Sequence, residues 1–248
     1  MPTDPASLAG LAALVLVAAV LYSSVGHAGA SGYLAAMALY GVAPSAMKPT
    51  ALVLNIIVAL IATTRFGRAG YTPWTLLAPL CLGSIPAAFI GGRITLPVHV
   101  HEPLLAVLLI LAALRLWFPG EGAVARPHPS APGLVAIGVV LGLAAGLTGI
   151  GGGVFLSPIL ILTGWDDPRR AAGASAPFIL ANSIAGLLGH ISTAQPVPQQ
   201  ATILVAAALS GGLFGSWLGA KQLQPLALRR VLALVMIVAS TKLIAAAF

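Results

Sequence analysis

The sequence predicts an all-α membrane protein with several spanning helices, and three observations carry this prediction. Of the 248 residues, 59% are hydrophobic and only 7% are charged, whereas soluble proteins carry about 25% charged residues. The mean hydropathy of +1.02 is too high for a disordered chain, despite 28 glycines and 19 prolines. The apolar residues are gathered into runs that approach the roughly 20 residues of a spanning helix. A water-soluble domain is therefore excluded.

Apolar runs between polar or Gly/Pro clusters predict ten helical segments. They lie at residues 7–25, 29–41, 46–64, 73–92, 100–118, 134–149, 152–164, 171–190, 200–220 and 228–247. Two segments, 29–41 and 152–164, would form only about 20 Å of helix, less than the hydrocarbon core of about 30 Å. The proline-rich stretch 119–133 predicts a linker, so that a first transmembrane repeat covers 1–118 and a second covers 134–248.

The two halves repeat one another in sequence. Residues 26–29 match residues 149–152, Asn55 matches Asn182, and the spacing G-x7-G-[GA]-[RK]-x3-P occurs in both halves. Because five segments per half is an odd number, the second half is expected to be inverted in the membrane relative to the first. The sequence therefore predicts two inverted five-segment repeats, with short broken or re-entrant helices at the glycine-rich stretches.

Loop charges support this inversion. Ten alternating crossings place nine of the 12 Lys and Arg residues on one side of the membrane and three on the other, the asymmetry expected when positive loops face the cytoplasm. A parallel arrangement with four crossings per half places seven of these basic residues on one side and five on the other. We expect a multi-pass protein of the inner or plasma membrane with both termini on the outer face. If the first two segments of each half form a re-entrant hairpin instead, every loop keeps its side, so the charges leave this alternative open.

Two glycine-rich breaks, residues 26–32 and 149–153, each open one of the short segments. Glycine allows positive φ and close backbone approach, and a helix N-terminus presents free N–H groups and partial positive charge. Inverted-repeat transporters place such ends around an anionic group near the midplane. The breaks therefore predict a substrate site with Gly26, His27, Gly29, Ser31, Gly149, Gly151, Gly152 and Gly153 as candidates. Close helix packing through small residues is the structural alternative.

A polar helix face follows each break. Lys48 and Asn55 lie seven residues apart, hence on one face, and Ser175 and Asn182 repeat that spacing. Asparagine inside an apolar span needs a partner in the bundle interior or a wet cavity, so these four residues join the candidate site. For each asparagine taken individually, a purely structural hydrogen bond between helices explains its presence about as well as a role in binding.

Three basic side chains have competing interpretations. His27 could donate to an anion or carry a coupled proton, and packing as a neutral side chain is the alternative. Lys48 could draw an anion toward the site, with snorkelling to the membrane surface as the default. His190, at the end of its segment, is expected to cap the helix or contact the interface.

The absent motifs exclude several function classes. The five acidic residues lie outside the apolar runs or at their edges, and no HExxH, GxSxG or CxxC pattern occurs. We therefore expect a protein that is not an enzyme and holds no metal and no cofactor. The net charge of +7 is explained by basic loops at an anionic leaflet, so no nucleic-acid partner is expected. The expected partners are a small anionic substrate and the lipid bilayer, with no oligomeric state predicted.

Residues 146–158 and 174–189 resemble the TauE/SafE family, and residues 22–35 look like the first-half counterpart of this pattern. The resemblance implies a secondary transporter, usually an exporter of sulfite or organosulfonates. The family pattern carries over directly to Gly149, Gly151, Gly152 and Gly153. In the first half it carries over only to Gly26 and Gly29, because Ala28 and Ala30 replace two expected glycines. Whether the two breaks contribute equally to binding is thereby left open.

The leading hypothesis is an alternating-access transporter whose anionic substrate sits between the two breaks. Export driven by a proton gradient rests on His27 and on the missing carboxylates, and a facilitator without coupling fits almost as well. A membrane enzyme, or a non-transporting membrane subunit built on the same helices, is the rival from another class.

Overall fold

The computed structural model describes residues 2, 4–24, 26–118, 127–193, 201–220 and 226–247, and their regular structure is entirely helical. The helices are α1 (Pro5–Ser24), α2 (Ala30–Leu39), α3 (Pro44–Arg68), α4 (Trp74–Arg93), α5 (Val98–Trp117), α6 (Ala131–Thr148), α7 (Gly153–Thr163), α8 (Pro168–Ile191), α9 (Ala201–Ala220) and α10 (Leu226–Ala247). Each corresponds to one of the ten predicted segments. The all-α prediction is confirmed for this part of the chain.

Helix starts and ends follow from local chemistry. Proline begins α3 and α8 and occupies the first turn of α6, where its missing N–H would have had no intrahelical partner. In α8 the carboxylate of Asp167 also accepts from the N–H groups of Arg169 and Arg170, at 2.8 and 3.1 Å. Because Ala131 begins α6, the helix reaches three residues into the predicted linker, whose residues 119–126 lie outside the described part.

Within the part of the chain that the structure describes, five helices are long and apolar enough to cross a membrane: α1, α3, α4, α6 and α8. The two short segments fall at α2 and α7, which have 10 and 11 residues. At 1.5 Å per residue they span about 15 and 17 Å, roughly half of a hydrocarbon core. The chain is thus a multi-pass membrane protein in which each glycine-rich break leads into a half-length helix.

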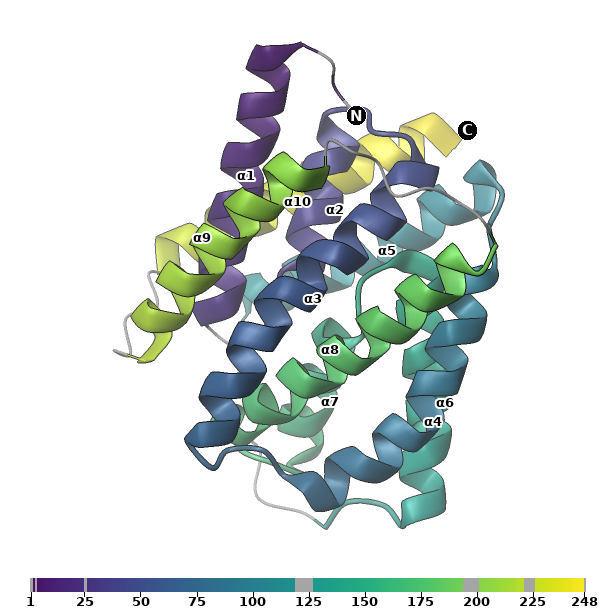
Figure 1. Ribbon diagram of the computed structural model, residues 1–248, viewed down its shortest axis with the longest axis vertical. Coiled ribbons are helices and arrows are strands. Elements are labelled where there is room, and N and C mark those ends of the chain that lie inside the picture. Colours follow the sequence, from purple (N-terminus) through teal and green to yellow (C-terminus); the bar gives the residue numbers. More distant parts are fainter. Residues whose placement is uncertain are drawn as a thin grey trace.

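The helices of the two halves are interleaved. Figure 1 shows α1 and α9 on one side, α4 and α6 on the other, and α3 and α8 side by side between them, while α5 packs on α10. Each of these four pairs joins one of the five N-terminal helices to one of the five C-terminal helices. Both breaks are therefore enclosed by helices from both halves.

Small residues allow the close approach of α4 and α6. Three glycines spaced four residues apart, Gly138, Gly142 and Gly146, form one stripe on α6. A Cβ added to any of them would overlap a carbonyl oxygen of α4, that of Leu80, Ser84 or Ala88 respectively. Such stripes let helix backbones touch inside a membrane, where lipid supplies no hydrophobic drive for helix association.

Candidate functional site

The second break forms the better-defined half of the candidate site. Gly149, Gly151 and Gly152 all have positive φ, at +82°, +79° and +82°, so the chain leaves α6, turns through left-handed conformations and enters α7. Gly152 is the N-cap residue of α7 and provides no side-chain capping bond. Neither Gly151 nor Gly152 donates its N–H to another described residue. The first turn of α7 thus keeps donors and the positive end of a helix dipole available.

Asn55 reaches this break from α3. Its side chain is 0% exposed, and its Nδ2 lies 3.5 Å from the carbonyl oxygen of Gly149 and 3.3 Å from that of Ile150. These bonds are long, and Asn55 Oδ1 has no hydrogen-bond partner among the described residues. These are interhelical hydrogen bonds, the structural alternative expected from the sequence, and the role of Asn55 in binding substrate stays a prediction.

Ser183 belongs to the same cluster and is missing from the residues predicted from sequence. A Cβ added to Gly151 would lie 2.9 Å from both Ser183 Oγ and Asn55 Nδ2, so both polar groups border the backbone of Gly151. Ser183 Oγ is buried and lacks a described partner. The signal that could have identified it is a hydroxyl directly after Asn182 in the middle of an apolar span.

The other predicted residues of α8 differ in their surroundings. Asn182 is buried, but its Nδ2 donates to the carbonyl oxygen of Phe178 one turn earlier, at 2.8 Å, and its Oδ1 is unpartnered in the described part of the chain. Ser175 Oγ lies 2.6 Å from Ser157 Oγ of α7. Ser175 therefore borders α7, whereas Asn182 bonds to its own helix and does not mirror Asn55.

The first break has a different chemistry. Gly26 and Gly29 have φ values of +79° and +99°, and Gly29 is the N-cap of α2 with no side-chain capping bond. Ser31 Oγ lies 2.5 Å from the hydroxyl of Tyr22, which also contacts the sulfur of Met236 at 3.4 Å. The polar groups here bond mostly to one another. The two breaks thus differ in structure, and whether they contribute equally to substrate binding stays an open question.

His27 lies between the two glycines of the first break. It is half-buried, its backbone N–H donates to the carbonyl oxygen of Tyr22 at 2.9 Å, and its ring meets that of Tyr22 edge-on with centroids 6.4 Å apart. Its role as a substrate donor or proton carrier stays a prediction.

Lys48 occupies a place that sequence reasoning did not anticipate. Its side chain is 7% exposed, so the expectation of snorkelling to the membrane surface is wrong. Its Nζ donates to the carbonyl oxygens of Gly91, Gly92 and Ile94 at 3.0, 2.9 and 3.0 Å. These groups form the C-terminal end of α4, where a cation complements the helix dipole. The ammonium thus donates all three of its N–H groups to the end of α4, and the backbone of Lys48 packs against Gly149.

A proline inside α8 frees one backbone carbonyl. Pro177 has no N–H and cannot bond to the carbonyl oxygen of Gly173 four residues earlier. Thr72, from the connection between α3 and α4, donates to that oxygen at 3.3 Å.

At the start of α8, Asp166 pairs with Arg170 at 2.9 Å. Burial raises the pKa of Asp166, and Arg170 offsets part of that rise.

The arrangement has the chemistry of an anion or neutral polar ligand site. Asn55, Ser183 and the start of α7 meet at Gly151, and Ala28 and Ala30 of the first break share one buried apolar cluster with Ile150 of the second. Among the described residues, no group of three or more His, Cys, Asp or Glu side chains could hold a metal ion. That both breaks open on one shared pocket stays a prediction.

Comparison with known proteins places this geometry in context. The family model described as sulfite exporter TauE/SafE matches residues 11–243. The probable membrane transporter protein y4hK of Sinorhizobium fredii (strain NBRC 101917 / NGR234) is 36% identical over 240 residues, which cover 95% of this chain and 97% of that protein. No solved structure matches the chain.

Proposed function

This chain belongs to the sulfite exporter TauE/SafE family, and from that premise we propose that it is a secondary transporter that exports a small anion by alternating access. The coarser part of this function, a membrane transporter, agrees with the name of its 36% identical relative. Sulfite or an organosulfonate is the substrate class that we favour, because the family name refers to sulfite and the site offers neutral donors to an oxyanion.

The observation that carries the proposal is the cluster at Gly151. An uncapped helix N-terminus, an asparagine and a serine converge there, and Asn55 Oδ1 and Ser183 Oγ have no described partner. Buried polar groups without partners are costly, which favours their use by a ligand. We propose that the N–H groups at the start of α7, the Ser183 hydroxyl and Asn55 Nδ2, whose bonds to Gly149 and Ile150 are long, donate to the substrate oxygens.

The paired helices support an inverted repeat. If α1 to α5 correspond in order to α6 to α10, the α4–α6 pair corresponds to the α9–α1 pair, and α5–α10 and α3–α8 each correspond to themselves. All four pairs pack together, as a two-fold relation between the halves requires. Odd numbers of segments then place the halves in opposite orientations, which suits rocking of one half against the other.

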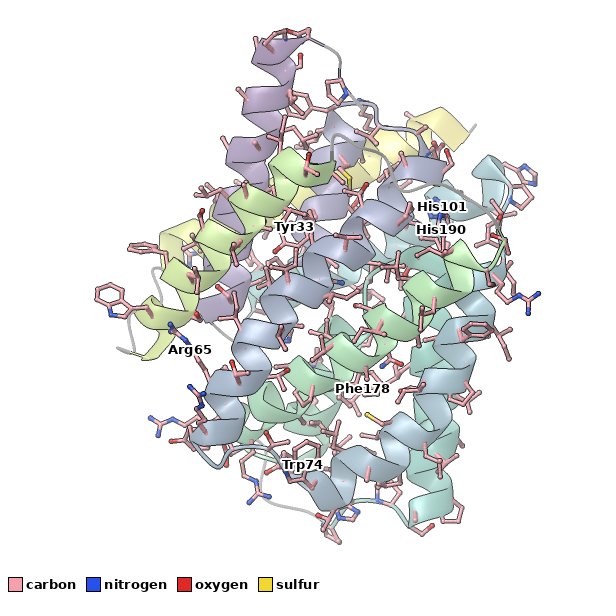
Figure 2. All side chains as sticks on the ribbon, in the orientation of Figure 1. Tyr33, Arg65, Trp74, His101, Phe178 and His190 are labelled. Atoms are coloured by element: carbon pink, nitrogen blue, oxygen red, sulfur yellow. The ribbon has the colours of Figure 1, made fainter. Side chains whose placement is uncertain are left out.

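Both termini are proposed to lie on the outer face of the cell membrane. The start of α1 and the end of α10 lie at the top of Figure 1, and Arg65 lies at the left edge, well below them, in Figure 2. That lower part of the molecule also carries Arg68, Arg169 and Arg170 at helix termini. Positive residues gather on the cytoplasmic side, so we assign the arginine-bearing end to the cytoplasm.

His27 is the candidate for carrying a coupled proton, and facilitated transport without coupling is the alternative.

Transport by purified protein in liposomes tests the proposal. We expect labelled sulfite to enter vesicles preloaded with unlabelled sulfite, and competition by other anions to define the substrate class. The Ser183→Ala variant removes a single hydroxyl, and a lost hydrogen bond to a charged ligand, about 1.5–3 kcal/mol, lowers apparent affinity at least about tenfold. Ser210→Ala is the matched control, since this exposed hydroxyl on α9 bonds only within its own helix.

A second variant tests the site independently, in case neighbouring donors replace the lost Ser183 hydroxyl. Gly152→Val places a branched side chain at φ +82° against the ring of Phe178, 2.9 Å from the new Cβ. We expect it to abolish transport while the protein still inserts into membranes. Counterflow that is absent for every sulfur oxyanion and organosulfonate tested with wild-type protein would instead favour the non-transporting membrane subunit or enzyme.

A further inference from the structure

A small cavity opens close to Arg93, at the other end of α3 from Arg65 and Arg68. It has a volume of about 30 Å³ and is lined by Pro44, Ser45, Lys48, Ile94, Thr95, Leu96, His101, Leu147 and His190. These residues come from α3, the α4–α5 connection, α5, α6 and α8. Since a water needs about 10–15 Å³ of such space, the cavity accommodates a ligand of a few heavy atoms. It is separate from the Asn55–Ser183 cluster described above.

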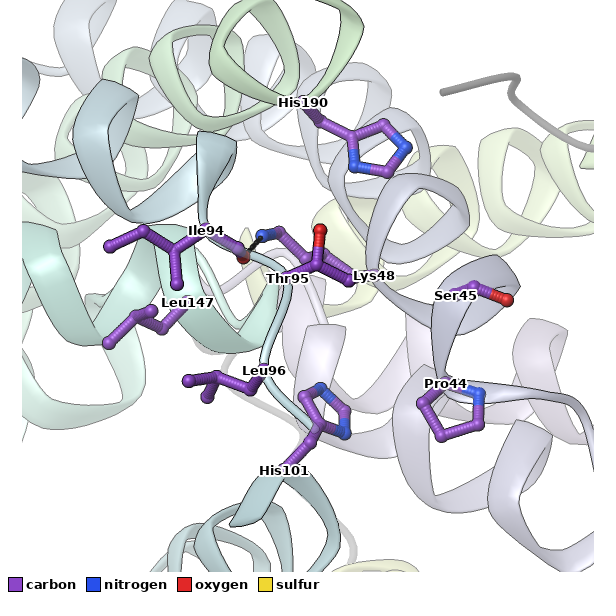
Figure 3. A pocket seen from close by; sticks show the side chains of 9 residues that line it. All are labelled: Pro44, Ser45, Lys48, Ile94, Thr95, Leu96, His101, Leu147 and His190. Carbon is purple, nitrogen blue, oxygen red and sulfur yellow. Dashed lines mark hydrogen bonds between the residues drawn. The ribbon is translucent and has the colours of Figure 1, made fainter. Parts of the chain in front are cut away.

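Two buried imidazoles face this cavity without hydrogen-bond partners. His101 and His190 are 4% and 5% exposed, and both His101 ring nitrogens and His190 Nε2 lack a partner in the described part of the chain. Figure 3 shows the two rings turned into the space beside Lys48 and Thr95. Figure 2 places both histidines together at this end, although they lie on α5 and α8. Unpaired buried polar groups of this kind call for a ligand or solvent partner.

The charges around the cavity favour an anion over a cation. Lys48, buried in the wall, donates its three N–H groups to carbonyl oxygens and still contributes a full positive charge. The lining contains no carboxylate, the usual ligand of Ca²⁺ and Mg²⁺, and the described residues hold no group of three His, Cys, Asp or Glu side chains that could bind a metal ion. Ser45 and Thr95 are exposed and supply hydroxyl donors at the mouth. The donor set thus consists of imidazole N–H groups and hydroxyls beside a fixed cation.

We propose that this cavity is a second binding site, for one small tetrahedral or pyramidal oxyanion, with His101 and His190 as its principal donors. A neutral imidazole donates through one nitrogen and a protonated imidazole through both. Binding therefore strengthens as the pH falls and the imidazoles become protonated. The charged or titratable residues next to the lining residues in sequence are Arg93 at the end of α4 and His99 and Glu102 on α5, besides Lys48 itself.

The position of the site links it to the proposed transport route without depending on it. Leu147, which lines the cavity, lies two residues before Gly149, and the backbone of Lys48 packs against Gly149. An anion in this cavity thus sits next to the second glycine break, on the face that we assign to the outside. There it would occupy the exit of an exporter.

Equilibrium binding of labelled sulfate to the purified full-length protein tests this site. We expect saturable binding that is tighter at pH 6 than at pH 8, and at least tenfold weaker in both His101→Gln and His190→Gln. His99→Gln is the matched control, because His99 lies on the same helix, is exposed and is not part of the lining. It should bind as the wild type does.

Ser183→Ala separates this site from the central one. We expect sulfate binding to persist in that variant even where transport is reduced. The proposal is overturned if wild-type protein shows no saturable sulfate binding, if both histidine variants bind as the wild type does, or if His99→Gln weakens binding as much as they do. Loss of binding in Ser183→Ala with retention in both histidine variants assigns the sulfate to the central cluster instead. Thermal melts of each variant confirm that the binding protein is folded.

Discussion

Replacement of Gly151 by alanine tests the geometry of the central cluster most directly. Gly151 has φ +79°, a conformation that costs an L-residue about 1–2 kcal/mol. The new Cβ would also lie 2.9 Å from Asn55 Nδ2, 2.9 Å from Ser183 Oγ and 3.0 Å from Ile179 Cγ2. Ordinary contacts begin near 3.4 Å, so each neighbour must move by about 0.4–0.5 Å.

Gly70→Ala provides a control with the same backbone cost and no collision. Gly70 has φ +75°, and a Cβ there would meet nothing within 4 Å. The backbone strain alone should cost both variants about 1–2 kcal/mol of stability, which corresponds to roughly 2–8 °C in the unfolding midpoint. Only Gly151→Ala displaces the polar groups of the cluster. Because a misplacement of about 1 Å can reduce a rate 100-fold, we expect its transport to fall at least about tenfold.

The measurement is the initial rate of labelled sulfite counterflow in proteoliposomes, with midpoints determined by thermal unfolding in detergent. Equal transport by Gly151→Ala and Gly70→Ala would refute the assignment of the Asn55–Ser183 cluster to the substrate path. Equal loss of transport in both variants would show that backbone strain alone is responsible, which would also contradict the reasoning.

Two further predictions concern the packing around the site. Lys48→Met leaves three carbonyl groups at the end of α4 without their donor, two of them buried. We expect a loss of at least about 3 kcal/mol and a midpoint roughly 6–12 °C lower. Lys242→Met, which frees one carbonyl at an exposed site, should shift the midpoint far less, and equal shifts would contradict the capping role. Gly142→Ala should destabilise the protein by about 1–3 kcal/mol, because its Cβ overlaps the Ser84 backbone on α4. Gly67→Ala is the control, since a Cβ there would lie in open space; it should raise the unfolding midpoint through alanine's higher helix propensity. An unchanged midpoint in Gly142→Ala would contradict the close contact between α4 and α6.

Local features of the sequence were sufficient to predict the elements of this fold. Each apolar run became a helix, because hydropathy and segment length act within about 20 consecutive residues. The two breaks were predicted at the right places, since several glycines in succession disfavour helix and favour left-handed turns. The short helices after them were predicted for the same reason.

Contacts between distant segments could not be predicted in the same way. The default placement of Lys48 at the membrane surface was wrong because its partners, the carbonyls at the end of α4, lie more than 40 residues further along the chain. Ser183 was missed because a single hydroxyl in an apolar span is common, and only its approach to Gly151 distinguishes it.

The amino-acid sequence by itself determined that this chain enters a membrane as ten helical segments, two of them half-length and opened by glycine. Only the tertiary structure decided which polar groups meet: Asn55 and Ser183 at Gly151, and His101 and His190 beside Lys48. The physical reason is that hydrophobicity, which is read along the chain, places each segment in the bilayer but does not select its neighbours. That selection depends on the shapes of the helix surfaces, such as the glycine stripe that joins α6 to α4.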